Sequence, residues 1–173
     1  KITIPNSVIV IDRNRDDGGI YLFESESGSF SDNNLKSVII PNSVKTIGSW
    51  AFKNNYLTSI IIPNSVTSIE CPQAFKNNKV TSMIIPNSVV YMGIASFEDN
   101  NLTSVVLSNS IEYISEYTFA NNKLTSLKIP NNIRSIKSFA FTNNNLTSVI
   151  IPNSITNIDQ DAFTNNKLRN VTI

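Results

Sequence analysis

Apolar residues recur along the chain in a pattern that returns about every 22 residues. One unit can be written L-x-x-V-x-I-P-N-S-V-x-x-I-x-x-x-A-F-x-N-N-x, and the text NNYLTSIIIPNSVTSIECPQAF begins one copy at residue 54. The leucine position returns in steps of 22, 23, 22, 22, 22 and 22, at Leu35, Leu57, Val80, Leu102, Leu124, Leu146 and Leu168. A phenylalanine keeps the same steps, at Phe30, Phe52, Phe75, Phe97, Phe119, Phe141 and Phe163. Repeats of this length predict a solenoid in which each unit forms one turn.

Each unit predicts a short strand, a corner and a return. Ile60 and Ile62 alternate with Ile61, so these side chains point to opposite faces of a strand. The following proline has no N–H for a sheet ladder and ends the strand. Val66 and Ile69 are three positions apart, which favours an irregular or 3₁₀-like return over a regular strand. No window carries a 3.6-residue period, so we expect almost no α-helix.

The alignment predicts eight stacked parallel strands, near residues 1–4, 36–40, 58–62, 81–85, 103–107, 125–129, 147–151 and 169–173. The first full turn directs one apolar set inward: Leu35, Val38, Ile40, Val44, Ile47, Ala51 and Phe52. Neither end of the chain has the polar capping unit that normally closes a solenoid. We therefore expect residues 1–173 to form one solenoid domain within a longer array.

The repeated text resembles a known family. L-x-x-L-x-L is typical of leucine-rich repeats, and IPNSVTSI…AF resembles the BspA-like (Treponema pallidum-type) bacterial repeats over essentially the whole chain. The resemblance implies a mostly β solenoid with a parallel sheet on the concave face and short strands or 3₁₀ turns on the convex side. It also implies a non-catalytic bacterial cell-surface or secreted protein for adhesion, which binds host extracellular matrix or another bacterial surface protein.

Two departures from the family pattern give expectations of their own. Ser108 stands where other units have proline, which predicts a looser corner. The second residue of each Asn-Asn pair occupies a column in which the family often has cysteine. We expect this column to form a hydrogen-bonded ladder along the coil, through Asn33, Asn55, Asn78, Asn100, Asn122, Asn144 and Asn166.

Composition excludes several classes of function. The net charge is +1, from 14 basic and 13 acidic residues, which gives no field for nucleic acid. No apolar run approaches the roughly 20 residues of a membrane helix, so we expect no membrane insertion. Histidine is absent, which excludes Ser–His and Cys–His nucleophile pairs. No facing carboxylates and no glycine-rich phosphate loop are visible, so we predict neither an enzyme nor a cofactor.

The outward strand position is the main candidate ligand site. Its column is mostly apolar: Thr3, Ile39, Ile61, Ile84, Val106, Lys128, Ile150 and Thr172. One interpretation is that β-branched residues merely suit strands. The other is an apolar groove for a partner, with Lys128 as its polar contact and the neighbouring Ser59, Ser82 and Ser104 beside it. A passive spacer is an alternative function, and a carbohydrate binder is disfavoured because the concave face has no aromatic platform.

An insertion interrupts the first unit within residues 12–29. It fits a tolerated surface excursion, and the alternative is a binding loop on a rigid scaffold. Asp12, Asn14 and Asp16 have the alternate spacing of a calcium loop. The match then fails, because Asp17 stands at the turn glycine and Phe23 at the closing glutamate. Calcium is therefore only a weak candidate, and no other metal is expected.

Overall fold

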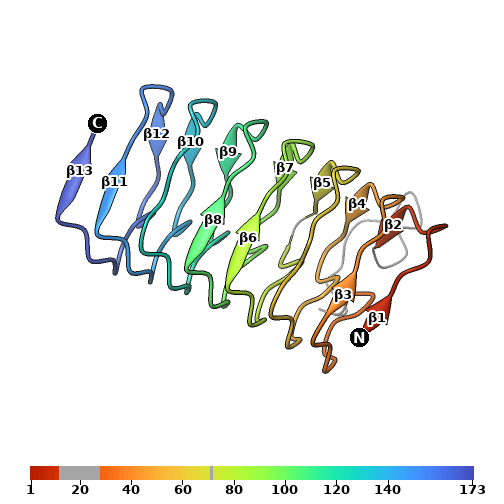
Figure 1. Ribbon diagram of the computed structural model, residues 1–173. Helices are drawn as coiled ribbons and strands as arrows, with labels where there is room; N and C mark the ends of the chain where they lie inside the picture. The colour runs from red at the N-terminus through yellow and green to blue at the C-terminus, as the bar shows by residue number, and fades with distance from the viewer. Residues whose placement is uncertain (12–27, 71) are drawn as a thin grey trace, which may run out of the picture.

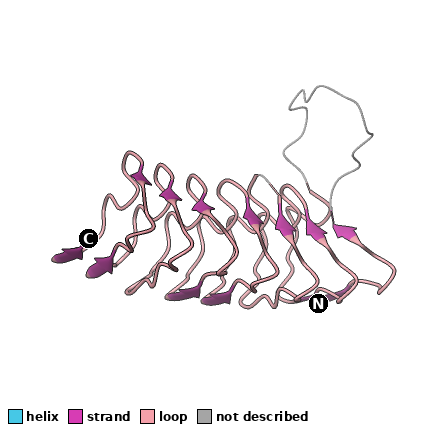
Figure 2. Cartoon of the chain, turned by 90° about the horizontal axis from the view of Figure 1, so that it is seen from above, coloured by secondary structure: helices cyan, strands magenta, loops and turns pink. Residues whose placement is uncertain are grey.

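The computed structural model describes residues 1–11, 28–70 and 72–173, which coil into a row of stacked turns (Figure 1). These residues contain short strands, turns and bends and no helix. Figure 2 shows two rows of strands along the coil, joined by loops. The leucine-rich-repeat solenoid expected from the sequence is thereby confirmed, with little or no helix in the described part.

One row of strands forms the side that we call the sheet face. It consists of β1 (Ile2–Thr3), β3 (Val38–Ile39), β6 (Ser82–Ile84), β8 (Ser104–Val106), β11 (Ser148–Ile150) and β13 (Asn170–Thr172). They pair in parallel as β1–β3, β6–β8 and β11–β13, and Lys128 adds a single bridge to Ile150.

The predicted strand at 58–62 is not formed, and that at 125–129 is reduced to the one bridge. Ser59 and Ile61 are exposed like the equivalent residues of β6 and β8, but their backbone is not paired in a ladder. Stacking of the turns does not depend on these pairs, because other sides of the coil supply regular backbone hydrogen bonds.

The second row of strands forms the return face. It consists of β2 (Val10–Ile11), β4 (Thr46–Ile47), β5 (Ser68–Ile69), β7 (Tyr91–Met92), β9 (Tyr113–Ile114), β10 (Ser135–Ile136) and β12 (Asn157–Ile158). They pair in parallel in the orders β2-β4-β5-β7 and β12-β10-β9. The expected irregular or 3₁₀-like return was therefore wrong in detail. These strands are two residues long, and equivalent positions of successive turns align in register.

A third side, the turn side, carries the phenylalanines and much of the hydrogen bonding between turns. Between two turns, Trp50 N–H bonds to Pro72 O (2.9 Å), Phe52 N–H to Ala74 O (2.8 Å) and Asn54 N–H to Lys76 O (3.0 Å). The same three bonds recur at the next turns, always with the donor on the earlier turn. Successive turns therefore stack at a fixed spacing even where the sheet face is unpaired.

Two residues per turn adopt left-handed backbone conformations on this side, two positions before and two after the phenylalanine. Their φ angles run from 54° to 63°, at Asp32, Trp50, Asn54, Gln73, Asn77, Ala95, Asp99, Tyr117, Asn121, Phe139, Asn143, Asp161 and Asn165. Asn and Asp tolerate this region well, whereas bulky side chains there are uncommon. At the first such position Gly28 has another role, since a Cβ would lie 2.3 Å from the Trp50 carbonyl carbon.

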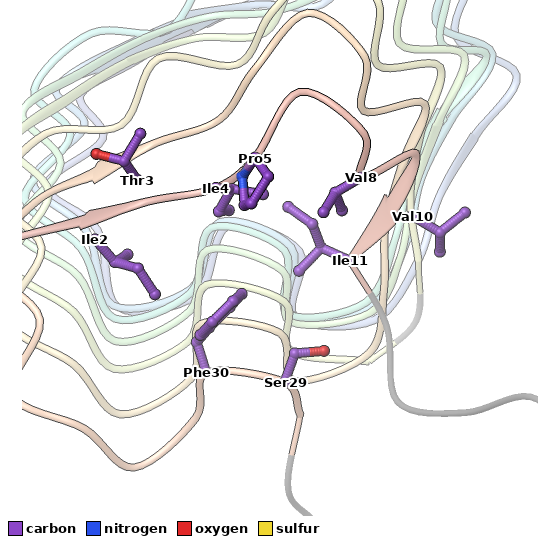
Figure 3. A pocket seen from close by; sticks show the side chains of 9 residues that line it. All are labelled: Ile2, Thr3, Ile4, Pro5, Val8, Val10, Ile11, Ser29 and Phe30. Atoms are coloured by element: carbon purple, nitrogen blue, oxygen red, sulfur yellow. The ribbon is translucent and has the colours of Figure 1, made fainter.

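The core is a stack of phenylalanine rings surrounded by aliphatic side chains. Neighbouring rings from Phe30 to Phe163 are stacked, with centroids 5.3 to 5.7 Å apart and interplanar angles of 4° to 14°. The predicted inward set of the first full turn is buried or packs against this core. At the N-terminal end the core opens into a hollow of about 280 Å³ between Ile2, Val8, Ile11 and Phe30 (Figure 3).

Candidate functional site

The predicted apolar column lies on the outside of the sheet face. Strands β6, β8 and β11 turn their central residue into the core and the flanking residues to solvent. The column is 48% to 83% exposed at Ile39, Ile61, Ile84, Val106 and Ile150. Five aliphatic side chains that are accessible along one face are more than strand geometry requires, since threonine satisfies the same backbone.

Strand pairing brings members of this column together. Ile84 lies opposite Val106, and Ile150 lies opposite both Lys128 and Thr172. Paired parallel strands are about 4.8 Å apart, so these side chains are neighbours. Ser82 and Ser104 are also paired and exposed, and Ser59 is exposed in the turn before. The structure therefore places the predicted residues on one surface.

Lys128 lies at a hollow of about 690 Å³ near the C-terminal end of the sheet face. Leu127, Ile150 and Ile173 are among its apolar lining residues. Among the described residues, no carboxylate or hydrogen-bond acceptor pairs with the Lys128 ammonium. A basic group beside aliphatic side chains is suited to a ligand that carries both apolar groups and an acceptor.

The weak calcium candidates Asp12, Asn14 and Asp16 lie outside the described residues, as does most of the 12–29 insertion. The described segments contain no group of three or more acidic or cysteine side chains that could hold a metal ion. They also contain no helix with the length and apolar character needed to cross a membrane.

The asparagine pairs form two different rows, and the expectation for them was only partly right. The second, buried residue bonds to backbone: Asn78 Oδ1 accepts from Leu57 N–H (3.1 Å), and its Nδ2 donates to the carbonyls of Phe52 and Phe75 (2.9 and 3.1 Å). The ladder of side chain to side chain is formed by the first residue of each pair. Its bonds are Asn54 to Asp32, Asn77 to Asn54, Asn121 to Asp99, Asn143 to Asn121 and Asn165 to Asn143.

This outer ladder, which we call the amide row, is interrupted between Asn77 and Asp99. A carboxylate cannot donate, so Asp99 accepts from the following turn and makes no bond to Asn77. Lys76 bonds to Glu98 (2.7 Å) and lies 3.5 Å from the Asp99 carboxylate. Partial burial lowers the pKa of Lys76, but hydrogen bonds and attraction to these two carboxylates outweigh it and raise the pKa above its ordinary value. The sequence shows the pairs, but not which member faces solvent.

The coil, the parallel strand rows and the phenylalanine stack define a leucine-rich-repeat protein. A model of the BspA-type leucine-rich repeat region matches residues 24–93 and 71–173, with six copies. The chain therefore belongs to the BspA-type leucine-rich-repeat family. Domains of this class generally bind proteins. No curated protein matches the chain significantly.

Solved structures of bacterial repeat proteins share the fold. A leucine-rich repeat protein from Bacteroides ovatus is 25% identical with a TM-score of 0.60, over 98% of this chain and 50% of that one. A leucine-rich cell surface protein from Faecalibacterium prausnitzii is 24% identical with a TM-score of 0.55, over 98% of this chain and 58% of that one. A leucine-rich repeat protein from Eubacterium ventriosum is 22% identical with a TM-score of 0.58, over 75% of this chain and 42% of that one. The chain thus spans about half the length of these proteins.

Proposed function

We propose that this chain is a non-catalytic protein-binding module of a bacterial cell-surface or secreted protein, and that its ligand binds the sheet face. The observation that carries the proposal is the column of exposed aliphatic side chains at Ile39, Ile61, Ile84, Val106 and Ile150. A contiguous exposed apolar surface is typical of interaction sites. Lys128 supplies the polar contact, and Ser59, Ser82 and Ser104 border the column.

Energetics support this surface as a site. Burying one aliphatic side chain contributes about 1.5–3 kcal/mol, so contact with a few members of the column gives substantial gross binding energy. The rigid coil presents them without ordering a loop, which reduces the entropic cost of binding. A protein of the host extracellular matrix or another bacterial surface protein fits as partner, in agreement with the cell-surface description of the F. prausnitzii neighbour.

The experiment replaces Ile61, Ile84 and Val106 together by threonine. Threonine keeps β-branching, and these side chains are exposed, so the melting curve should barely move. Capture of partners from an extracellular-matrix extract, and from a bacterial surface-protein extract, should fall by about tenfold or more, since about 1.4 kcal/mol corresponds to tenfold. The single change Lys128→Glu should also weaken capture, because it replaces the basic polar contact by a carboxylate.

A matched control replaces Ile9 and Val90 by threonine. Both are exposed on the return face, and the control makes the same kinds of change, one Ile→Thr and one Val→Thr, on another side of the coil. Capture should be unchanged in this control. Equal capture by the sheet-face variant and the wild type, at equal stability, refutes the sheet-face site. No capture by the wild type from either extract supports the passive spacer instead.

A further inference from the structure

We propose a second binding site, for a carbohydrate, at the corner of the coil that carries the asparagine pairs. A polar hollow of about 340 Å³ lies there, within the roughly 300–1,000 Å³ range of small-molecule sites. The hollow is lined by Asp32, Asn34, Asn54, Tyr56, Asn77 and Lys79, among others. The site is separate from the apolar column and does not depend on the function proposed for the sheet face.

Two parallel rows of side chains border the hollow. The first is the beginning of the amide row, with Asp32, Asn54 and Asn77 at the same position of three successive turns. The second row lies two residues further along each turn, at Asn34, Tyr56 and Lys79. Backbone bonds of 2.9 Å from Tyr56 N–H to Leu35 O and from Lys79 N–H to Leu57 O hold these turns together. The two rows therefore have a fixed spacing along the coil.

The first row and the base of the hollow are ordered before any ligand arrives. Asn54 Nδ2 donates to Asp32 Oδ1 (2.6 Å), and Asn77 Nδ2 donates to Asn54 Oδ1 (2.9 Å). Beneath them Asn55 is buried, accepts from Leu35 N–H (3.0 Å) and donates to the Phe30 carbonyl (2.8 Å). A pre-ordered polar surface loses little conformational entropy when it binds a ligand.

Several groups of the hollow still have hydrogen-bonding capacity. Within the described segments, no intramolecular partner occupies the second Asp32 carboxylate oxygen, the Asn34 amide, the Tyr56 hydroxyl or the Lys79 ammonium. The set combines acceptors on Asp32 with donors on Lys79, and the Asn34 amide supplies both. Sugar hydroxyls donate and accept at once, so a pair of neighbouring hydroxyls matches this combination.

Tyr56 adds the apolar element that a sugar ring requires. It is 51% exposed and lines the hollow. Equivalent positions of the other turns hold only Asn or Lys, at Asn34, Lys79, Asn101, Lys123, Asn145 and Lys167. An aromatic ring has a large apolar face and a polar edge. The C–H bonds on one side of a pyranose can pack on that face, while its hydroxyls reach the neighbouring polar groups.

The same chemistry disfavours other ligands. A divalent cation prefers several carboxylate and carbonyl oxygens, whereas this hollow has one carboxylate and a lysine. An apolar peptide side chain has no groups that hydrogen-bond to the amide row. The ligand class that fits is a hexose residue of a glycan, bound through neighbouring hydroxyls and one ring face.

The test uses a glycan array with the intact chain, followed by titration of the retained glycan into wild type and variants. Tyr56→Asn introduces the residue that Asn34 and Asn101 already provide at this position, so the coil tolerates it. We expect it to weaken glycan binding by about tenfold or more. Tyr56→Phe should retain most of the binding, and Asp32→Asn, which still accepts from Asn54, should weaken it.

Two controls separate this site from the sheet face. Lys123→Asn changes the same column outside the hollow and should leave glycan binding unchanged. The triple threonine variant at Ile61, Ile84 and Val106 should also bind the glycan normally, so the two proposals can fail independently. The proposal is overturned if the array retains no glycan, if binding survives Tyr56→Asn, or if only the sheet-face variant abolishes it.

Discussion

Each buried asparagine of the repeated pairs joins two turns through the backbone. Asn122 Oδ1 accepts from Leu102 N–H at 2.9 Å, and its Nδ2 donates to the carbonyls of Phe97 and Phe119 at 2.9 and 3.2 Å. The backbone N–H and C=O groups that point to the inside of the coil cannot hydrogen-bond to water. The asparagine satisfies those groups, which is why a polar residue occupies a buried column.

Asn122→Ala should lower the free energy of unfolding by at least about 2 kcal/mol, because buried backbone groups that lose a partner cost about 1–3 kcal/mol each. Its matched control is Asn121→Gly, which removes only side-chain bonds of the amide row. Glycine tolerates the left-handed conformation that Asn121 adopts, so the backbone is not strained. Denaturant titration measures both. Similar losses at the two positions would contradict the different roles of the two rows.

The phenylalanine stack makes a second prediction at the scale of the residue. Phe97 is fully buried between Phe75 and Phe119, with ring centroids 5.4 and 5.7 Å away, so Phe97→Ala should cost roughly 3–5 kcal/mol. Phe163 is only partly buried and stacks on Phe141, so Phe163→Ala should cost less. Chemical denaturation curves compare the two variants, and equal costs would count against a continuous stack.

At the scale of the element, the corner after each sheet-face segment depends on one residue. Val44, Val66 and Val89 donate their N–H to the proline carbonyl three residues earlier, at 3.0 to 3.1 Å. Where proline is replaced, the buried Ser108 Oγ donates to Val89 O at 2.8 Å and accepts from Ser110 N–H at 3.0 Å. The corner expected to be looser is therefore tied to the preceding turn by a side chain.

Ser108→Ala should destabilise the fold by about 1–3 kcal/mol, because it leaves a buried carbonyl without its donor. Ser110→Ala changes an exposed side chain in the same corner and should shift stability by less than about 0.5 kcal/mol. Thermal melts of the two variants provide the measurement. An unchanged melting temperature for Ser108→Ala would show that the hydroxyl does not hold this corner.

At the scale of the whole molecule, the described residues form a one-dimensional stack in which backbone bonds and ring contacts join each turn to its neighbours. The backbone bonds between turns join residues about one repeat apart, and the ring stack follows the same order. Stability in such an array comes from each turn and from its interfaces with the turns on either side. When residues 1–173 are studied by themselves, the first and last turns have one such interface, so they should open more readily than central turns.

Native-state hydrogen exchange tests this expectation. The backbone amides of Phe97 and Phe119, each bonded to the following turn at 2.9 Å, should exchange most slowly. Amides of the end strands β1 and β13 should exchange faster by about an order of magnitude or more. Uniform protection from end to end would mean that the coil opens only as a single unit.

Much of this architecture is determined by the sequence alone. The steps of Leu35 to Leu168 determine one turn per repeat, and alternation around Ile61 determines which side chains face solvent. The phenylalanine column predicts the core stack for the same reason, because residues one repeat apart must lie above one another. These inferences succeed because strand periodicity and repeat length are local properties of the chain.

Other features were decided only when the turns were stacked. Which asparagine of a pair is buried depends on carbonyls more than 20 residues away, such as Phe52 O for Asn78. Pairing on the return face, and the absence of sheet-face pairing at 58–62, depend on how neighbouring turns align. The hollow at Tyr56 likewise combines side chains from three turns, although the tyrosine is visible in the sequence as the one aromatic in its column. Such sites arise from contacts between turns, whose geometry a single repeat does not contain.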